Sequence, residues 1–94
     1  MKVLSAQEID DKLKEIIGWS FSNNNIAKEF QLQNFKSAIS FVNKIGEEAE
    51  KMDHHPNIFL HSWNKVKITI STHSAGGVTQ NDFNLAKRIE EIVK

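Results

Sequence analysis

The spacing of hydrophobic residues changes several times along the chain, and each change marks the border of a predicted element. In three segments the apolar residues recur every three or four positions, as on one face of an amphipathic helix. The three stripes are Ile9, Leu13, Ile16 and Ile17; then Phe35, Ala38, Ile39, Val42, Ile45, Ala49 and Met52; and last Phe83, Ala86, Ile89 and Val93. The chain is therefore predicted to form three helices.

Residues suited to helix ends flank these stripes. Ser5–Glu8 and Thr79–Asp82 have the spacing of a capping box, and Asn34 is a suitable N-cap for the central helix. Gly18 is a natural residue to end the first helix. The central helix should end at or just before His55, because the only proline of the chain follows it.

Between the helices, apolar residues alternate with polar ones, as on strands with one buried face. One hairpin is predicted around the turn residues 22–25, and another from strands 57–63 and 65–72, joined near Asn64. The element order is then α-β-β-α-β-β-α. It predicts an α+β fold in which three helices cover one face of a four-stranded antiparallel sheet.

Length and charge narrow the choice of partners. The 94 residues suit a single domain over 1–94, and Lys and Arg together number 12, as do Asp and Glu. With no net positive field, direct binding of nucleic acid is not expected. No apolar run approaches the roughly 20 residues of a membrane span, and the N-terminus runs directly into polar residues. The chain has no cysteine, so thiolate chemistry is excluded and a cytoplasmic setting is expected.

All four histidines lie in one quarter of the chain. His54 and His55 are predicted at a helix-to-strand corner, and His73 at or just beyond the end of the last strand, on its polar side. Three converging imidazoles suit acid–base chemistry near neutral pH, with one ring as proton acceptor and another as donor. Alternatively, the histidine pair simply satisfies the carbonyls of a helix end and faces water.

A metal site is the chemical rival, because three histidines can hold zinc. However, adjacent histidines in an extended backbone point to opposite sides, so His54 and His55 reach one ion only if the chain bends between them. The spacing matches no established metal motif. No metal is therefore expected.

Other candidate residues allow two interpretations each. Asp82 either caps the last helix or orients a group of the site, and Glu50 is either a solvated helix residue or a site residue. His61 falls on a predicted strand, either at the surface or lining the site. Trp19 and Trp63 are interpreted as core or interface aromatics rather than as ligand stackers. The glycine pair at 76–77 is too weak a signal to indicate phosphate binding.

One set of spaced residues is more specific than any of these features. The set consists of Glu50, three residues, His54-His55-Pro56, six residues, Trp63, nine residues, His73, eight residues and Asp82. This pattern resembles the signature of the pterin-4a-carbinolamine dehydratase family, also known as the dimerisation cofactor of a hepatocyte nuclear factor. The similarity extends over nearly the whole chain, through Gly18-Trp19, Asn64-Lys65-Val66, Ser71-Thr72-His73 and the segment from Asp82 to Ala86.

The resemblance implies a hydro-lyase that converts 4a-hydroxytetrahydrobiopterin to quinonoid dihydropterin and water, which recycles the pterin used by an aromatic amino-acid hydroxylase. By analogy, His54 and His73 form the acid–base pair, and His55 completes the catalytic set mainly by holding and orienting the pterin. Supporting contacts to the substrate and the histidines are implied for Glu50, Asp53, Ser71, Thr72 and Asp82. Loss of water transfers no electrons, so no cofactor is expected.

The resemblance also implies assembly into a homodimer or homotetramer by sheet pairing and helix packing, and a second role as a protein partner. A non-catalytic interaction module is therefore the alternative to the enzyme. The chain departs from the family pattern in three places. The spacer between Pro56 and Trp63 is long, which predicts a bulge or a shifted turn, Ile58 stands where some members have an aromatic, and Gly77-Val78 replaces Gly-Leu.

Overall fold

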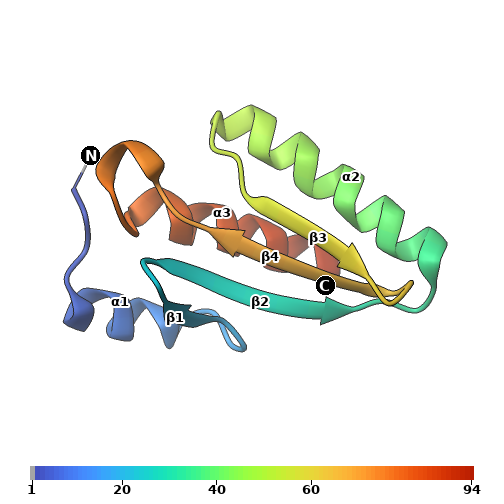
Figure 1. Ribbon diagram of the computed structural model, residues 1–94, viewed down its shortest axis with the longest axis horizontal. Helices are drawn as coiled ribbons and strands as arrows, with labels where there is room; N and C mark the ends of the chain where they lie inside the picture. The colour runs from blue at the N-terminus through green and yellow to red at the C-terminus, as the bar shows by residue number, and fades with distance from the viewer. Residues whose placement is uncertain (1) are drawn as a thin grey trace.

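The computed structural model describes residues 2–94; Met1, where the predicted domain begins, lies outside them. The described residues form three α-helices, four strands and one short 3-10 helix (Figure 1). In chain order the elements are α1 (Ala6–Leu13), β1 (Ser20–Ser22), β2 (Asn25–Gln31), α2 (Phe35–Met52), β3 (Asn57–His61), β4 (Lys65–Ile70), the 3-10 helix η1 (His73–Ala75) and α3 (Gln80–Val93). Among residues 2–94, no helix is both long and apolar enough to cross a membrane.

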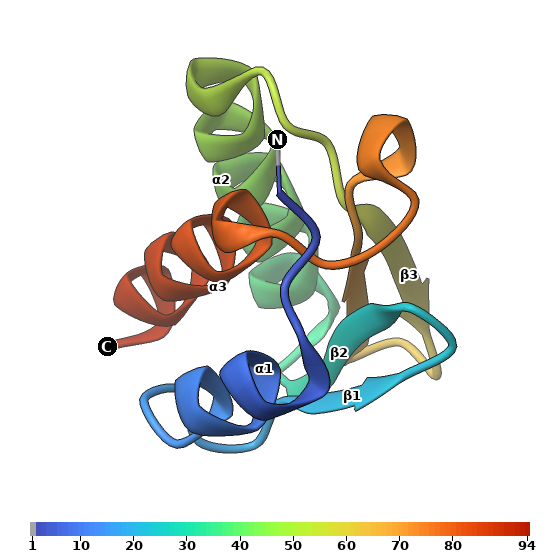
Figure 2. The same ribbon diagram turned by 90° about the vertical axis from the view of Figure 1, so that its left-hand side faces the viewer.

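The four strands form one antiparallel sheet in the order β1-β2-β4-β3. β4 lies between β2 and β3, so Thr69 pairs with Ala27 on one side and with Asn57 on the other. All three helices lie on the same face of the sheet, as Figure 2 shows from the side. The predicted α+β fold and element order are confirmed, with the short η1 helix as an addition.

The core lies between the sheet and the helices. Alternation along β2 and β4 buries one row of side chains on each strand, as predicted. The fully buried large side chains are Phe83, Ile26, Ile45, Ile68, Ile70, Leu85, Ile89, Val66 and Val78, together with the polar Thr79 and Asp82. Thr79 and Asp82 are the two polar side chains in this fully buried set, and both lie at the start of α3.

The predicted N-caps are present. The Asn34 side-chain oxygen accepts a hydrogen bond from the Ser37 N–H at 2.8 Å, which satisfies one free donor at the start of α2. Ser5 and Glu8 exchange the two hydrogen bonds of a capping box, at 3.2 and 2.9 Å. These local signals fix where the helices begin.

The end of the first helix was predicted too late. α1 ends at Leu13, and the chain then passes through turns to Gly18, whose φ of +93° is in the region that favours glycine. Ile16 still reaches the core, but Ile17 is 85% exposed. The prediction failed because the apolar spacing continues through a turn that is not helical.

The predicted stripe of α2 is also wrong at its edges. The buried residues of this helix are Ala38, Phe41, Ile45 and Ala49, whereas Phe35 and Ile39 are 53% and 41% exposed. Phe41 instead packs edge-on against Phe30 of β2, with ring centroids 5.0 Å apart. In α3, Leu85 joins the buried residues and Val93 is exposed.

The β3–β4 connection contains the shifted turn rather than a bulge. Pairing is continuous from Asn57–Thr69 to His61–Lys65, and a three-residue connection follows in which Ser62 and Trp63 have φ of +50° and +58°. Trp63 is 61% exposed, so a core role for this residue is wrong. Trp19, in contrast, is buried, and its indole N–H donates to Glu90 at 2.9 Å.

Candidate active site

Two connections meet at one end of the sheet, the one from α2 to β3 and the one from β4 to α3 (Figure 1). α2 stops at Met52, and Asp53 follows in the left-handed conformation with φ +50° and ψ +44°. The N–H of His54 still bonds to the Ala49 carbonyl at 3.1 Å, which closes the helix end. His54 and His55 therefore leave the helix at a sharp corner, as the proline had indicated.

A cavity of about 330 Å³ lies between this corner and the segment after β4. We call it the histidine cavity; its lining residues are Asp53, His54, His55, Ser71, Thr72, His73 and Ser74. Three histidines from two distant parts of the sequence thus share one cavity.

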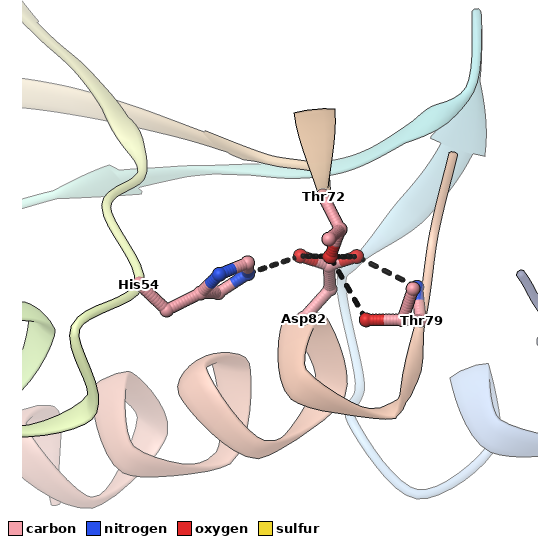
Figure 3. Close-up of polar contacts among 4 residues, drawn as sticks. All are labelled: His54, Thr72, Thr79 and Asp82. Atoms are coloured by element: carbon pink, nitrogen blue, oxygen red, sulfur yellow. Dashed lines mark hydrogen bonds and ion pairs between the residues drawn. The ribbon is translucent and has the colours of Figure 1, made fainter. Parts of the chain in front are cut away.

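The ring of His54 contacts the buried carboxylate of Asp82. Its Nε2 lies 2.5 Å from Oδ1 of Asp82, which is 0% exposed (Figure 3). The Thr72 hydroxyl donates to both Asp82 oxygens at 3.2 and 3.1 Å, and the Thr79 N–H donates to Oδ2 at 2.8 Å. Asp82 therefore does both things considered for it, since it caps α3 and orients His54.

The sequence explains why these groups meet. Thr72 follows the buried row of β4, so its side chain turns toward the helices and not toward solvent. Asp82 is the third residue after the N-cap Thr79, a position where a carboxylate accepts the free N–H groups of a helix start. The Thr72 and Thr79 hydroxyls lie 2.8 Å apart and complete the network.

The network selects the ring nitrogen that His54 presents to the cavity. Both oxygens of Asp82 already accept hydrogen bonds, as expected for an ionised carboxylate, which can only accept. In the contact between Asp82 Oδ1 and His54 Nε2, the proton is therefore carried by Nε2. Nδ1 then remains for a ligand. A carboxylate at this position also stabilises the positive charge that appears when Nδ1 takes up a proton.

The other two histidines are more exposed. His55 Nε2 forms a short ion pair with Glu50, which lies one turn back on α2, and the two side chains are 57% and 76% exposed. The ring of His73 makes no hydrogen bond or ion pair with any group in residues 2–94. It stands at the start of η1, in a loop that is closed by a bridge between Thr72 and Gly77.

His61 lies outside the cavity. Its Nε2 is 2.6 Å from Glu29 on β2, and its ring stacks on Phe59 of the same strand at 4.8 Å. The hydrogen bond from His61 lowers the pKa of Glu29 below its ordinary value. Among residues 2–94, no group of three or more His, Cys, Asp or Glu side chains has the arrangement of a metal site.

The family of the chain follows from comparison with known proteins. The model of the family described as pterin 4 alpha carbinolamine dehydratase matches residues 2–92. The chain belongs to this family. The match confirms the family resemblance that the spaced histidines had indicated, and it covers nearly the whole chain.

Relatives of full length carry the family name provisionally. A protein of Sulfolobus acidocaldarius, provisionally named a pterin-4-alpha-carbinolamine dehydratase, is 47% identical over 89 residues, which cover 95% of this chain and 97% of the relative. A protein of Christiangramia forsetii with the same provisional name is 46% identical over 94 residues, which cover 100% and 96%.

Solved structures agree on the fold. A transcriptional coactivator/pterin dehydratase from Brucella melitensis superposes with a TM-score of 0.93 at 32% identity and covers 99% of this chain and 100% of its own. A pterin dehydratase-like protein described as a RuBisCO assembly factor in the alpha-carboxysome superposes with a TM-score of 0.65 over 79% of this chain and 84% of its own. At 17% identity, the latter shows the shared fold alone.

Two residues near the family's histidines were missed as site residues. Thr79 was recognised only as a helix cap, although it is 0% exposed and bonds to both Thr72 and Asp82. Ser74, which lines the histidine cavity, carried no signal in the sequence. A cap residue three positions before a candidate site carboxylate is the pattern that would have identified Thr79.

Proposed function

We propose that this protein is a 4a-hydroxytetrahydropterin dehydratase. The observation that carries the proposal is that His54, which contacts the buried Asp82, and the exposed His73 line one cavity. In the reaction, the C4a–O bond breaks and the hydroxyl leaves as water after taking up one proton. The N5–H bond breaks as well, and its electron pair forms the new C4a=N5 double bond, so no oxidant or reductant takes part.

The environments of the two histidines favour an assignment of roles. His54 accepts the N5 proton at Nδ1, because Asp82 holds its Nε2–H and stabilises the resulting imidazolium. His73, which has no carboxylate partner in residues 2–94, donates a proton to the leaving hydroxyl. Each such group typically contributes about 10²–10⁴-fold to the rate.

The remaining lining residues are assigned to substrate binding. His55, held by Glu50, contacts and orients the pterin, while Asp53 and Ser71 offer hydrogen-bonding groups to the heterocycle. Thr72 acts through Asp82 rather than on the substrate. In this arrangement, Glu50 and Thr72 are positioning residues.

A rapid-mixing assay tests the proposal. The decay of freshly generated 4a-hydroxytetrahydropterin is followed with and without the protein, before and after chelator treatment. We expect acceleration that survives chelation, a loss of about 10²-fold or more in His54→Ala and in His73→Ala, and near-complete loss in the double variant. His55→Ala should act chiefly on KM.

His61→Ala is the matched control, because this histidine lies on β3 outside the histidine cavity. It should retain wild-type turnover. A folded double variant of His54 and His73 that still turned over normally would exclude the proposed mechanism. Loss of activity on chelation, restored by stoichiometric zinc, would assign the histidines to a metal.

A non-catalytic interaction module is the second candidate. It is supported by the Brucella relative, which is described as both coactivator and dehydratase, and by the exposed Phe59 and Trp63 on and beside the edge strand β3. If the folded wild-type protein gave no acceleration, this function would replace the enzyme.

A further inference from the structure

The segment before α1 lies against the loop that leads from β4 to α3. The Leu4 N–H donates a hydrogen bond to the Val78 carbonyl at 2.8 Å. We call residues 2–4 the strap and residues 73–78 the His73 loop. Figures 1 and 2 both show the start of the chain beside this loop. The strap therefore contacts the part of the chain that carries His73 into the histidine cavity.

A second contact lies one residue earlier in the loop. Gly77 is buried, and a Cβ atom placed on it would lie 3.0 Å from Cγ1 and 3.8 Å from Cγ2 of Val3. The φ of Gly77 is not positive, so its backbone conformation does not call for glycine. What glycine permits here is the close approach of the Val3 side chain to the backbone of the loop.

Few other contacts fix the His73 loop. Its own hydrogen bonds run back to Thr72 and His73, so they close the loop on itself. The side chain of Val78 is buried in the core and anchors the end of the loop near α3. Within residues 2–94, the bond from Leu4 is the one hydrogen bond that joins the loop to a part of the chain outside residues 72–82.

The position of this loop matters for the site because the ring of His73 has no partner of its own. It makes no hydrogen bond or ion pair within residues 2–94, so its place in the histidine cavity is set by the backbone of the loop. A general acid has to lie within hydrogen-bond reach of the atom that it protonates. A misplacement of about 1 Å can lower the rate by about 10²-fold.

On this basis we infer that the strap is a positioning element of the active site. The Leu4 hydrogen bond and the Val3 contact hold the His73 loop where its imidazole reaches the leaving hydroxyl. The inference rests on the proposed dehydratase function. Neither Val3 nor Leu4 lines the histidine cavity, so both act through the loop and not on the substrate. If the strap loosened, His73 would move while the contact between His54 and Asp82 stayed in place.

Gly77→Ala tests the inference, because its new methyl group meets Val3, and Val3→Ala removes both of the carbon atoms that it meets. Amide exchange is measured at Ala75 and Gly76, whose N–H groups bond to the Thr72 carbonyl. In Gly77→Ala we expect this exchange to be about 10-fold faster and kcat for dehydration to fall about 5-fold, with KM nearly unchanged. In the double variant Gly77→Ala/Val3→Ala, both values should return to within about 2-fold of the wild type.

Gly46→Ala is the matched control, because Gly46 lies on α2 and an added Cβ meets nothing within 4 Å outside the helix backbone. It should keep the wild-type exchange and kcat. A thermal melt checks that each variant is folded, since a general loss of stability would speed exchange in the core as well as in the loop.

Wild-type exchange and kcat in Gly77→Ala overturn the inference. A loss that Val3→Ala does not reverse, or faster loop exchange with unchanged kcat, does so too, and each of these outcomes leaves the dehydratase function intact. If the wild type accelerates no dehydration, the proposed function fails, and the exchange rates alone decide whether the strap holds the loop.

Discussion

Through its two carboxylate oxygens, Asp82 both caps helix α3 and contacts the His54 ring. One oxygen accepts the Thr79 N–H at the start of α3, and the other accepts His54, while Thr72 bonds to both. A buried carboxylate is costly unless its hydrogen bonds are complete, and here they are. Because the cap fixes the carboxylate, the direction of the His54 ring is fixed by the backbone of α3.

This arrangement predicts the effect of Asp82→Asn. The asparagine can still accept the Thr79 N–H, but its amide would donate to His54 Nε2 and reverse the ring tautomer. We expect kcat for dehydration to fall by about 10²-fold or more with a small change in KM, as for other histidines that lose a carboxylate partner. The pH profile of kcat should shift as well.

Thr72→Val and Thr72→Ser form the matched pair for this prediction. Valine removes the hydroxyl that donates to Asp82 and should lower kcat in the same direction, whereas serine keeps the hydroxyl and should restore it. If Asp82→Asn lowered only thermal stability and left kcat and its pH profile unchanged, the carboxylate would be a cap and nothing more.

At the scale of elements, α2 shows what the sequence can and cannot predict. Its cap at Asn34 and its end near the proline follow from local backbone chemistry, which a sequence states directly. The face of α2 that packs on the sheet, in contrast, does not follow from local backbone chemistry. Phe35 and Ile39 are as apolar as Phe41, but only Phe41 meets β2, because helix rotation is set by the partner surface.

In the candidate active site, too, some features could be predicted from the sequence and others depend on packing. The spaced histidines and Asp82 were predictable because a family pattern fixes their positions, and the cavity does contain all three predicted histidines. The segment 22–25 was interpreted only as a turn, since nothing in the local sequence indicates that it lies near the end of β4. That neighbourhood depends on the pairing of β2 with β4, which brings Ile26 beside Ile70 although they are far apart in the chain.

A cross-helix ion pair connects α2 and α3 and gives an element-scale prediction. Hydrogen bonds from Lys51 and from Arg88, at 3.1 and 3.2 Å, lower the pKa of Glu48. A carboxylate whose pKa is lowered on folding adds stability above its unfolded pKa, and this stability is lost as the pH falls through the folded pKa. Glu48→Gln should therefore lower Tm at about pH 7 and lower it by less at about pH 3.

Glu47→Gln is the control, because Glu47 lies next in the same helix and forms no ion pair within residues 2–94. It should leave Tm nearly unchanged at both pH values. An equal effect of the two variants on Tm at about pH 7 would show that the cross-helix pair adds nothing beyond the loss of one surface charge.

At the scale of the whole molecule, the exposed apolar residues of α2 point to self-association. Phe35 and Ile39 are one helical turn apart on a flank that neither the sheet nor α3 covers, and they are 53% and 41% exposed. We expect a homodimer or homotetramer that buries this flank, with a mass that is a multiple of 10.7 kDa in sedimentation or light scattering.

The double variant Phe35→Lys/Ile39→Lys tests which surface is used. Two charges on the flank should convert the oligomer to a smaller species without loss of helical signal, because burying unpaired lysines costs more than the contact gains. Ser40→Lys, on a different flank of α2, should keep the wild-type mass. An oligomer that persists in the double variant would instead have to form through another surface, such as the edge strand β3, which is one of the two strands that the sheet order leaves at an edge.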